Sequence, residues 1–113
     1  MKEFLLVFRN DFAKNPRPGP EEMQAVMKLW MDWIGGIAAQ NKLVSPGSRL
    51  APTGKVVRAD SVVTDGPYTE LKEVLGGYTV VKAETLEEAS GLAHGCPILK
   101  MGGNVEVREI MTM

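Results

Sequence analysis

The segment KEFLLVF, residues Lys2–Phe8, predicts a β-strand that is covered by protein on both faces. Successive side chains of a strand point to opposite faces of the sheet, so Phe4, Leu6 and Phe8 share one face. The two residues between them, also apolar, share the other face. We therefore expect a central strand, because a strand that is apolar on both sides is typical of a sheet with both faces covered.

The segment that follows this strand predicts a long amphipathic helix. Pro20 suits the first helical position, and apolar residues then recur at spacings of three and four. These residues are Met23, Val26, Met27, Trp30, Ile34 and Ile37. We expect this stripe to lie in the core or in an interface. Gly35 and Gly36 should each cost the helix about 1 kcal/mol relative to alanine, and the helix should end near Asn41, which tolerates the left-handed conformation.

The middle of the chain predicts a hairpin. Residues 55–59 and 62–64 are rich in β-branched side chains and flank a turn at Asp60-Ser61. Residues 43–50, in contrast, form a poor strand that is broken by Pro46 and Gly47.

The last third of the chain predicts a strand, a short helix and a final strand. The strand covers residues 78–83. Thr85 and Glu88 have the spacing of a capping box, so a helix should start there and end before Pro97. The final strand covers about residues 104–111.

This order of elements predicts an α+β fold of the ferredoxin-like split βαβ type, with an antiparallel sheet and two helices on one face. A chain of 113 residues fits one domain, which we place at residues 1–113. Two helices on one face leave the other face of the first strand uncovered. Because most oligomers are symmetric homodimers, we expect a homodimer in which two sheets pack face to face around a shared cleft.

Composition excludes several classes of protein. Thirteen basic and fourteen acidic residues give a net charge of −1, so we expect no direct contact with nucleic acid and no binding to anionic membranes. One cysteine, Cys96, excludes a disulfide framework and a zinc cluster of the CxxC type. No phosphate-binding loop or dinucleotide motif occurs. We therefore expect a cytoplasmic protein that has no metal and no cofactor.

The segment TDGPYTELKEVLGGY, residues Thr64–Tyr78, is the most specific motif in the chain. It resembles the signature of the YCII-related domain family, DGPF type, with Tyr68 in place of the usual phenylalanine. The helix ending at residues 93–97 and the final strand at residues 105–108 resemble the family as well. The resemblance covers nearly the whole chain and implies a dimeric α+β barrel, in agreement with the dimer inferred from the first strand.

The resemblance implies little about a particular reaction. Some members of the wider superfamily use a histidine and an aspartate for proton transfer without a metal, with the histidine near the start of the first long helix. This chain has Glu21 and Glu22 in that region, and its only histidine is His94. Several DGPF-type proteins look like companions of extracytoplasmic-function sigma factors, which implies a regulatory role as an alternative.

Asp65 is the candidate catalytic residue. A carboxylate that lines a dry cleft is a stronger base than one in water, so Asp65 could act as a general acid or base. The alternative is a purely structural turn, in which the aspartate accepts backbone hydrogen bonds and Gly66 takes a positive φ.

Tyr68, Lys72 and Arg108 are the candidate substrate-binding residues, for a small anionic metabolite. A guanidinium such as that of Arg108 binds a carboxylate through two parallel hydrogen bonds. Arg108 and Glu106 share one face of the final strand, opposite two valines. The alternatives are a salt bridge across the dimer for this pair and a solvated surface position for Lys72.

Three functions follow from these patterns. The first is a cofactor-free enzyme that moves a proton on a small anionic metabolite. The second is a ligand-sensing or regulatory module linked to a sigma-factor pathway, and the third is a structural accessory dimer. We expect His94 to cap the second helix, where a cation is favourable, and Cys96 to be a buried structural thiol.

Overall fold

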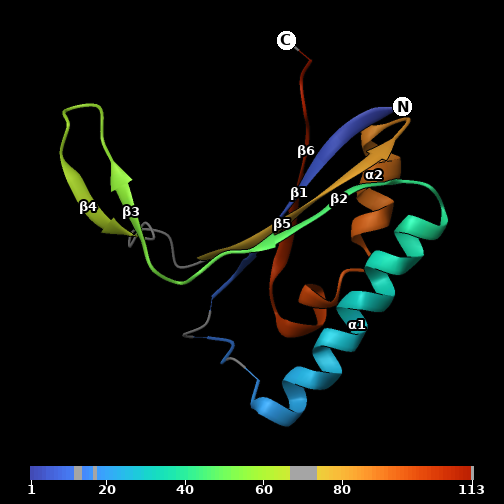
Figure 1. Ribbon diagram of the computed structural model, residues 1–113, viewed down its shortest axis with the longest axis horizontal. Coiled ribbons are helices and arrows are strands. Elements are labelled where there is room, and N and C mark those ends of the chain that lie inside the picture. Colours follow the sequence, from blue (N-terminus) through green and yellow to red (C-terminus); the bar gives the residue numbers. More distant parts are fainter. Residues whose placement is uncertain (12–13, 17, 67–73, 113) are drawn as a thin grey trace.

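The computed structural model describes residues 1–11, 14–16, 18–66 and 74–112. Within these residues, a four-stranded antiparallel sheet carries helices on one face, and a separate two-stranded hairpin extends from it (Figure 1). In chain order the elements are β1 Lys2–Asn10, α1 Pro20–Ala39, β2 Leu43–Arg49, β3 Gly54–Val57, β4 Val63–Gly66, β5 Val74–Ala83, α2 Leu86–Ala93, the 3₁₀ helix η1 Pro97–Met101 and β6 Asn104–Glu109.

The strand order across the main sheet is β2-β5-β1-β6, which confirms that β1 is central. Phe4 of β1 lies opposite Val81 of β5 and opposite Glu109 of β6, and both pairings are antiparallel. Helix α1 connects β1 to β2, and α2 lies between β5 and β6. The sheet and its helices therefore have the β-α-β-β-α-β order of the ferredoxin-like fold, as the sequence predicts.

The core lies between the sheet and the helices. Phe4, Leu6 and Phe8 of β1 are all buried there, together with Ile37 of α1. The other buried members of this core are Val81, Ala83, Ala89, Ala93, Cys96 and Ile98. Val105 and Val107 of β6 pack against the same core. Glu106 and Arg108, which alternate with these valines along the strand, therefore face the opposite side of the sheet.

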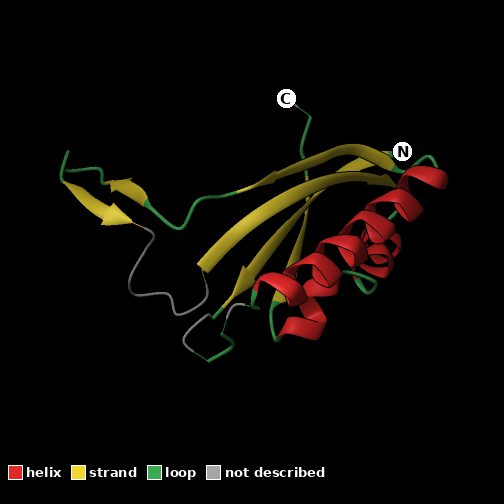
Figure 2. Ribbon diagram, turned by 60° about the horizontal axis from the view of Figure 1, so that its bottom comes forward, coloured by secondary structure: helices red, strands yellow, loops and turns green. Residues whose placement is uncertain are grey.

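No described element covers that opposite side of the sheet (Figure 2). Leu5 of β1 pairs with Val80 of β5, and Val7 pairs with Tyr78, so these four side chains share the open face. Leu5, Tyr78 and Val80 are half-buried. Val7 is 8% exposed, so a single chain leaves an apolar strip in the middle of its sheet that is only partly open to solvent.

β2 is a complete edge strand where the sequence indicates only a poor one. Its pairing with β5 shifts register on either side of Ser45, and Pro46 is tolerated because an edge strand has one unpaired side. Gly47 has φ +73°, and a Cβ at this position would collide with the carbonyl oxygen of Tyr78. Only glycine fits this close contact between β2 and β5.

β5 begins at Val74, earlier than the residue 78 predicted from sequence. A Cβ on Gly77 would lie 2.8 Å from the carbonyl oxygen of Ser48. The Gly76-Gly77 pair therefore belongs to the strand, where its lack of side chains lets β2 approach.

The predicted helix and turn signals are confirmed. Asn41 takes φ +58° just after α1, and Ser61 takes φ +68° in the turn between β3 and β4. At the start of α2, the Glu88 backbone N–H donates to Thr85 Oγ1 at 3.1 Å. The Glu88 carboxylate accepts from the backbone N–H of Glu84 at 3.2 Å. Among the described residues, no helix has the length and hydropathy needed to cross a bilayer.

Candidate functional site

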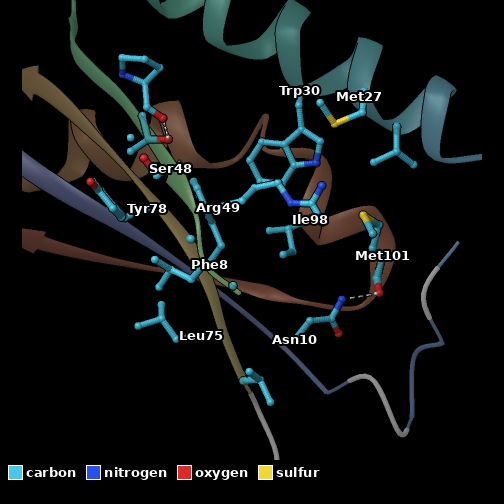
Figure 3. A pocket seen from close by; sticks show the side chains of 18 of the residues that line it. Phe8, Asn10, Met27, Trp30, Ser48, Arg49, Leu75, Tyr78, Ile98 and Met101 are labelled. Carbon is cyan, nitrogen blue, oxygen red and sulfur yellow. Dashed lines mark hydrogen bonds between the residues drawn. The ribbon is translucent and has the colours of Figure 1, made fainter. Parts of the chain in front are cut away.

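A cavity of about 300 Å³ lies between α1 and the sheet (Figure 3). Its wall on the sheet side includes Phe8 of β1 and Leu75 of β5, and η1 closes one end. On the helix side it is lined by the apolar stripe of α1, namely Met23, Val26, Met27, Trp30 and Ile34. Small-molecule sites in proteins are concave and mostly apolar, with volumes of about 300–1,000 Å³, so this cavity has the size and character of such a site.

The cavity exists because α1 is anchored to the core at only one end. Near its C-terminus, Ile37 is 2% exposed, and the Trp33 indole N–H donates to the carbonyl oxygen of Leu92 at 2.9 Å. Toward its N-terminus, Met27 remains 42% exposed although it belongs to the apolar stripe. The prediction that the stripe lies in the core is confirmed for Ile37, and Trp30 packs against the core. The part of the stripe nearer the N-terminus of α1 lines the cavity.

Phe8 and Trp30 line this cavity, and the ring of Trp33 packs behind them. The Phe8 ring packs edge-on against Trp30 with a centroid distance of 4.9 Å, and against Trp33 at 5.9 Å. The two indoles are 5.7 Å apart, also at a steep angle. Edge-to-face packing at these distances is the favourable geometry for aromatic pairs, so this wall is held in a defined shape.

Two of the polar side chains that line the cavity, Asn10 and Thr79, form hydrogen bonds within the chain. Asn10 is 2% exposed, and its amide Nδ2 donates to the carbonyl oxygen of Met101 at 3.2 Å. Asn10 Oδ1 accepts from Asn15 Nδ2 at 3.1 Å. Thr79 Oγ1 donates to the carbonyl oxygen of Pro46 at 3.1 Å. These bonds fasten β1 to η1 and β5 to β2, so they hold the cavity open rather than offering partners to a ligand.

Asp65 lies away from this cavity. It belongs to β4, and with β3 it forms the arm, a hairpin of residues 54–66 that extends beyond the sheet (Figures 1 and 2). Its carboxylate accepts a hydrogen bond from Lys55 Nζ at 2.7 Å, and its side chain is 90% exposed. In a single chain, Asp65 is therefore a surface residue.

Of the other predicted site residues, Arg108 is described, and the structure does not bring it to Asp65. Tyr68 and Lys72 lie outside the described residues. Arg108 is on the open face of β6, at the sheet edge opposite to the strand that leads into the arm. Arg108 donates to Glu106 at 3.2 Å, and Arg9 donates to the same carboxylate at 2.6 Å.

Comparison with known proteins places the chain in a family. The sequence model of the YCII-related domain matches residues 4–113, that is, β1 through β6 and beyond. This chain belongs to the YCII-related domain family. The match confirms the resemblance carried by the motif at residues 64–78, and it spans the whole fold described above.

One solved structure with a similar chain is the 5-chloro-2-hydroxyhydroquinone dehydrochlorinase TftG from Burkholderia phenoliruptrix AC1100, in complex with 2,5-dihydroxybenzoquinone. The two chains are 18% identical, the alignment covers 97% of this chain and 95% of that one, and the TM-score is 0.48. This likeness is too low for a function to be carried from one chain to the other. No curated protein matches the sequence.

The single cysteine of this YCII-related domain is inert. Cys96 is 2% exposed, and burial raises the pKa of its thiol to about 12. The thiolate is the nucleophilic form, so Cys96 is the buried structural thiol that the sequence predicts. His94 is the C-cap residue of α2, also as predicted. Within the described residues, no three His, Cys, Asp or Glu side chains gather in a way that could hold a metal ion.

Sequence reasoning missed Arg49, which lines the cavity of this YCII-related domain from the end of β2. The signal that could have found it is the preceding Pro46-Gly47 pair. A bulge in an edge strand commonly re-aims the side chain that follows it, and Arg49 directly follows the register shift between Ser45 and Ser48.

Proposed function

We propose that this YCII-related domain binds a small, largely apolar molecule in the cavity between α1 and the sheet. The supporting observation is the cavity itself, whose volume is about 300 Å³ and whose walls combine α1, the sheet and η1. Aromatic and methionine side chains are among the residues that line it, and such side chains suit apolar ligands. A bound molecule would also cover the half-exposed stripe of α1.

A fluorescent probe can test this proposal. N-phenyl-1-naphthylamine is neutral and apolar, and its emission rises in an apolar site. Trp30, which lines the cavity, should transfer excitation energy to the bound probe. The variant Val26→Phe places a ring in the cavity, whereas Ala25→Phe places the same ring on the neighbouring exposed position that does not line it.

We expect Val26→Phe to weaken probe binding by about tenfold or more, because it occupies part of the cavity that the ligand needs. Ala25→Phe should bind the probe like the parent protein. Equal binding by both variants, or no saturable binding by the parent, would refute the cavity as the ligand site. Circular dichroism of both variants controls for loss of the fold.

We also propose that the protein is a homodimer in which two sheets pack face to face. The apolar strip on the open face supports this proposal, and so does the arm, where Val57 is 73% and Val63 is 55% exposed. Apolar side chains gathered on one surface commonly mark an interaction site. Light scattering at micromolar concentration should give twice the mass of the chain, and Val57→Lys should weaken the dimer. A monomeric mass for the parent protein contradicts the proposal.

A second candidate function is acid–base catalysis by Asp65, with Tyr68, Lys72 and Arg108 binding an anionic substrate without a cofactor. The observation that favours it is the position of Asp65 on an arm that extends past its own sheet, where a second copy of the chain can meet it. Asp65→Asn should then abolish turnover and leave both folding and probe binding intact. A variant with unchanged turnover excludes this role.

The regulatory alternative uses the same cavity as a sensor. In this form the protein is a cytoplasmic module that changes its contact with an extracytoplasmic-function sigma-factor pathway when a ligand binds. The free thiol of Cys96 is consistent with a reducing compartment. Ligand binding without turnover, combined with an altered transcript level in a deletion strain, would favour sensing over catalysis.

A further inference from the structure

Among the described residues that line the cavity, one is cationic, namely Arg49 with its guanidinium group. The described residues that line it include no aspartate, glutamate, lysine or histidine. None of the ion pairs formed within the described part of the chain includes Arg49. Among the described residues, the cavity therefore presents one positive charge that forms no ion pair with an acid.

The backbone of β2 and β5 directs this charge to the cavity. Arg49 pairs with Gly77 across the strands, after the register shift that Gly47 makes possible. Because Gly77 has no side chain, the β2 backbone packs close against it, and a Cβ on Gly77 would lie 3.5 Å from the Arg49 Cα. The Arg49 side chain extends from β2 toward Trp30 of α1 (Figure 3).

The volume of the cavity limits the apolar part of the ligand. An engineered apolar cavity of about 150 Å³ binds benzene, so about 300 Å³ accommodates a substituted ring or two fused rings. Gly76 and Gly77, which have no side chains, line one part of the cavity, and the rings of Phe8 and Trp30 line another. These surfaces suit a planar body better than a branched one.

We propose that the ligand is a small aromatic monoanion, an aryl carboxylate in its simplest form, and that Arg49 binds its carboxylate while the ring lies against Trp30. This inference rests on the proposed cavity function and deepens it. The sequence predicts an anionic ligand held by Lys72 and Arg108, but the geometry points to a different cation. A guanidinium pairs with a carboxylate through two parallel hydrogen bonds, which makes this contact both strong and directional.

The test compares 2-naphthoate with its neutral analogue 2-naphthalenemethanol, as competitors of N-phenyl-1-naphthylamine on the full-length protein. We expect 2-naphthoate to bind the parent protein at least about tenfold more tightly than the alcohol. Arg49→Gln should remove this preference and leave alcohol binding unchanged. Lys28→Gln is the matched control, since it removes an exposed cation of α1 that does not line the cavity.

The outcomes separate this inference from the proposed function. If both naphthalenes bind the parent protein equally well and Val26→Phe weakens the binding of both, the cavity is a ligand site, but the proposed contact between Arg49 and the carboxylate is wrong. If Lys28→Gln removes the preference as strongly as Arg49→Gln does, the effect is one of overall charge, and the inference is also wrong. If neither compound competes with the probe, the proposed function itself fails. A preference that falls with added salt and disappears only in Arg49→Gln supports the inference.

Discussion

The variant Gly47→Ala tests the contact that connects β2 to β5 beside the cavity. Gly47 takes φ +73°, and an added Cβ would meet the carbonyl group of Tyr78. A left-handed conformation costs an L-residue about 1–2 kcal/mol. Forcing a methyl group against packed backbone costs about 1–3 kcal/mol more. We therefore expect the free energy of unfolding to fall by about 2–5 kcal/mol, a large part of the about 5–15 kcal/mol typical of a domain.

Urea denaturation followed by tryptophan fluorescence measures this loss, since both indoles lie beside the core. The matched control is Gly54→Ala at the start of β3, where an added Cβ meets nothing within 4 Å. This control should stay within about 0.5 kcal/mol of the parent protein. Because β2 must shift to relieve the collision, Gly47→Ala should also weaken 2-naphthoate binding through Arg49. A Gly47→Ala protein as stable as the control would refute the argument that only glycine fits here.

Three further predictions concern single interactions. Burial raises the pKa of the Cys96 thiol from 9.0 to about 12. The thiol should therefore resist a disulfide reagent at pH 8 until the protein unfolds. Denaturation curves should also show that the free energy of unfolding falls as the pH rises from about 9 toward 12. Hydrogen bonds from Arg108 and Arg9 lower the pKa of the Glu106 carboxyl group from 4.5. The ionised carboxylate therefore stabilises the fold above that pH, and this contribution is lost as the pH falls below it. Glu106→Gln should flatten the acid side of a plot of the free energy of unfolding against pH. Trp33→Phe keeps a ring but loses the 2.9 Å hydrogen bond to the carbonyl oxygen of Leu92. The free energy of unfolding, measured by urea denaturation, should therefore fall by about 1 kcal/mol.

The local signals of the sequence predicted the local structure well. Thr85 and Glu88 cap α2, and Asn41 takes the left-handed conformation, because both features depend on atoms within a few residues along the chain. The central position of β1 was also predictable, since its alternation of side chains leaves apolar residues on both faces. A strand with this pattern has few stable places in a sheet.

The candidate site depends on distances that no local pattern contains. Periodicity identifies the apolar face of α1, but it does not say how far Met27 and Trp30 stand from the sheet. The direction of Arg49 depends on how close Gly47 comes to Tyr78, a residue of another strand. The motif at residues 64–78 drew attention to Asp65, yet the fold puts this residue on the arm. In the proposed dimer, the role of Asp65 depends on a contact between chains, which no local sequence pattern contains.

Because α1 is attached to the core near one end, its two halves have different roles, one in stability and one in the shape of the cavity. Ile37 and Trp33 hold the helix to the core, whereas Met23, Val26 and Met27 line the cavity without being needed for that attachment. Substitutions in the first half of the helix can therefore change which molecules fit while the domain stays folded. Relatives with this fold could differ in ligand preference through a few substitutions in the first half of this helix. The same positions could be substituted to engineer a new ligand preference.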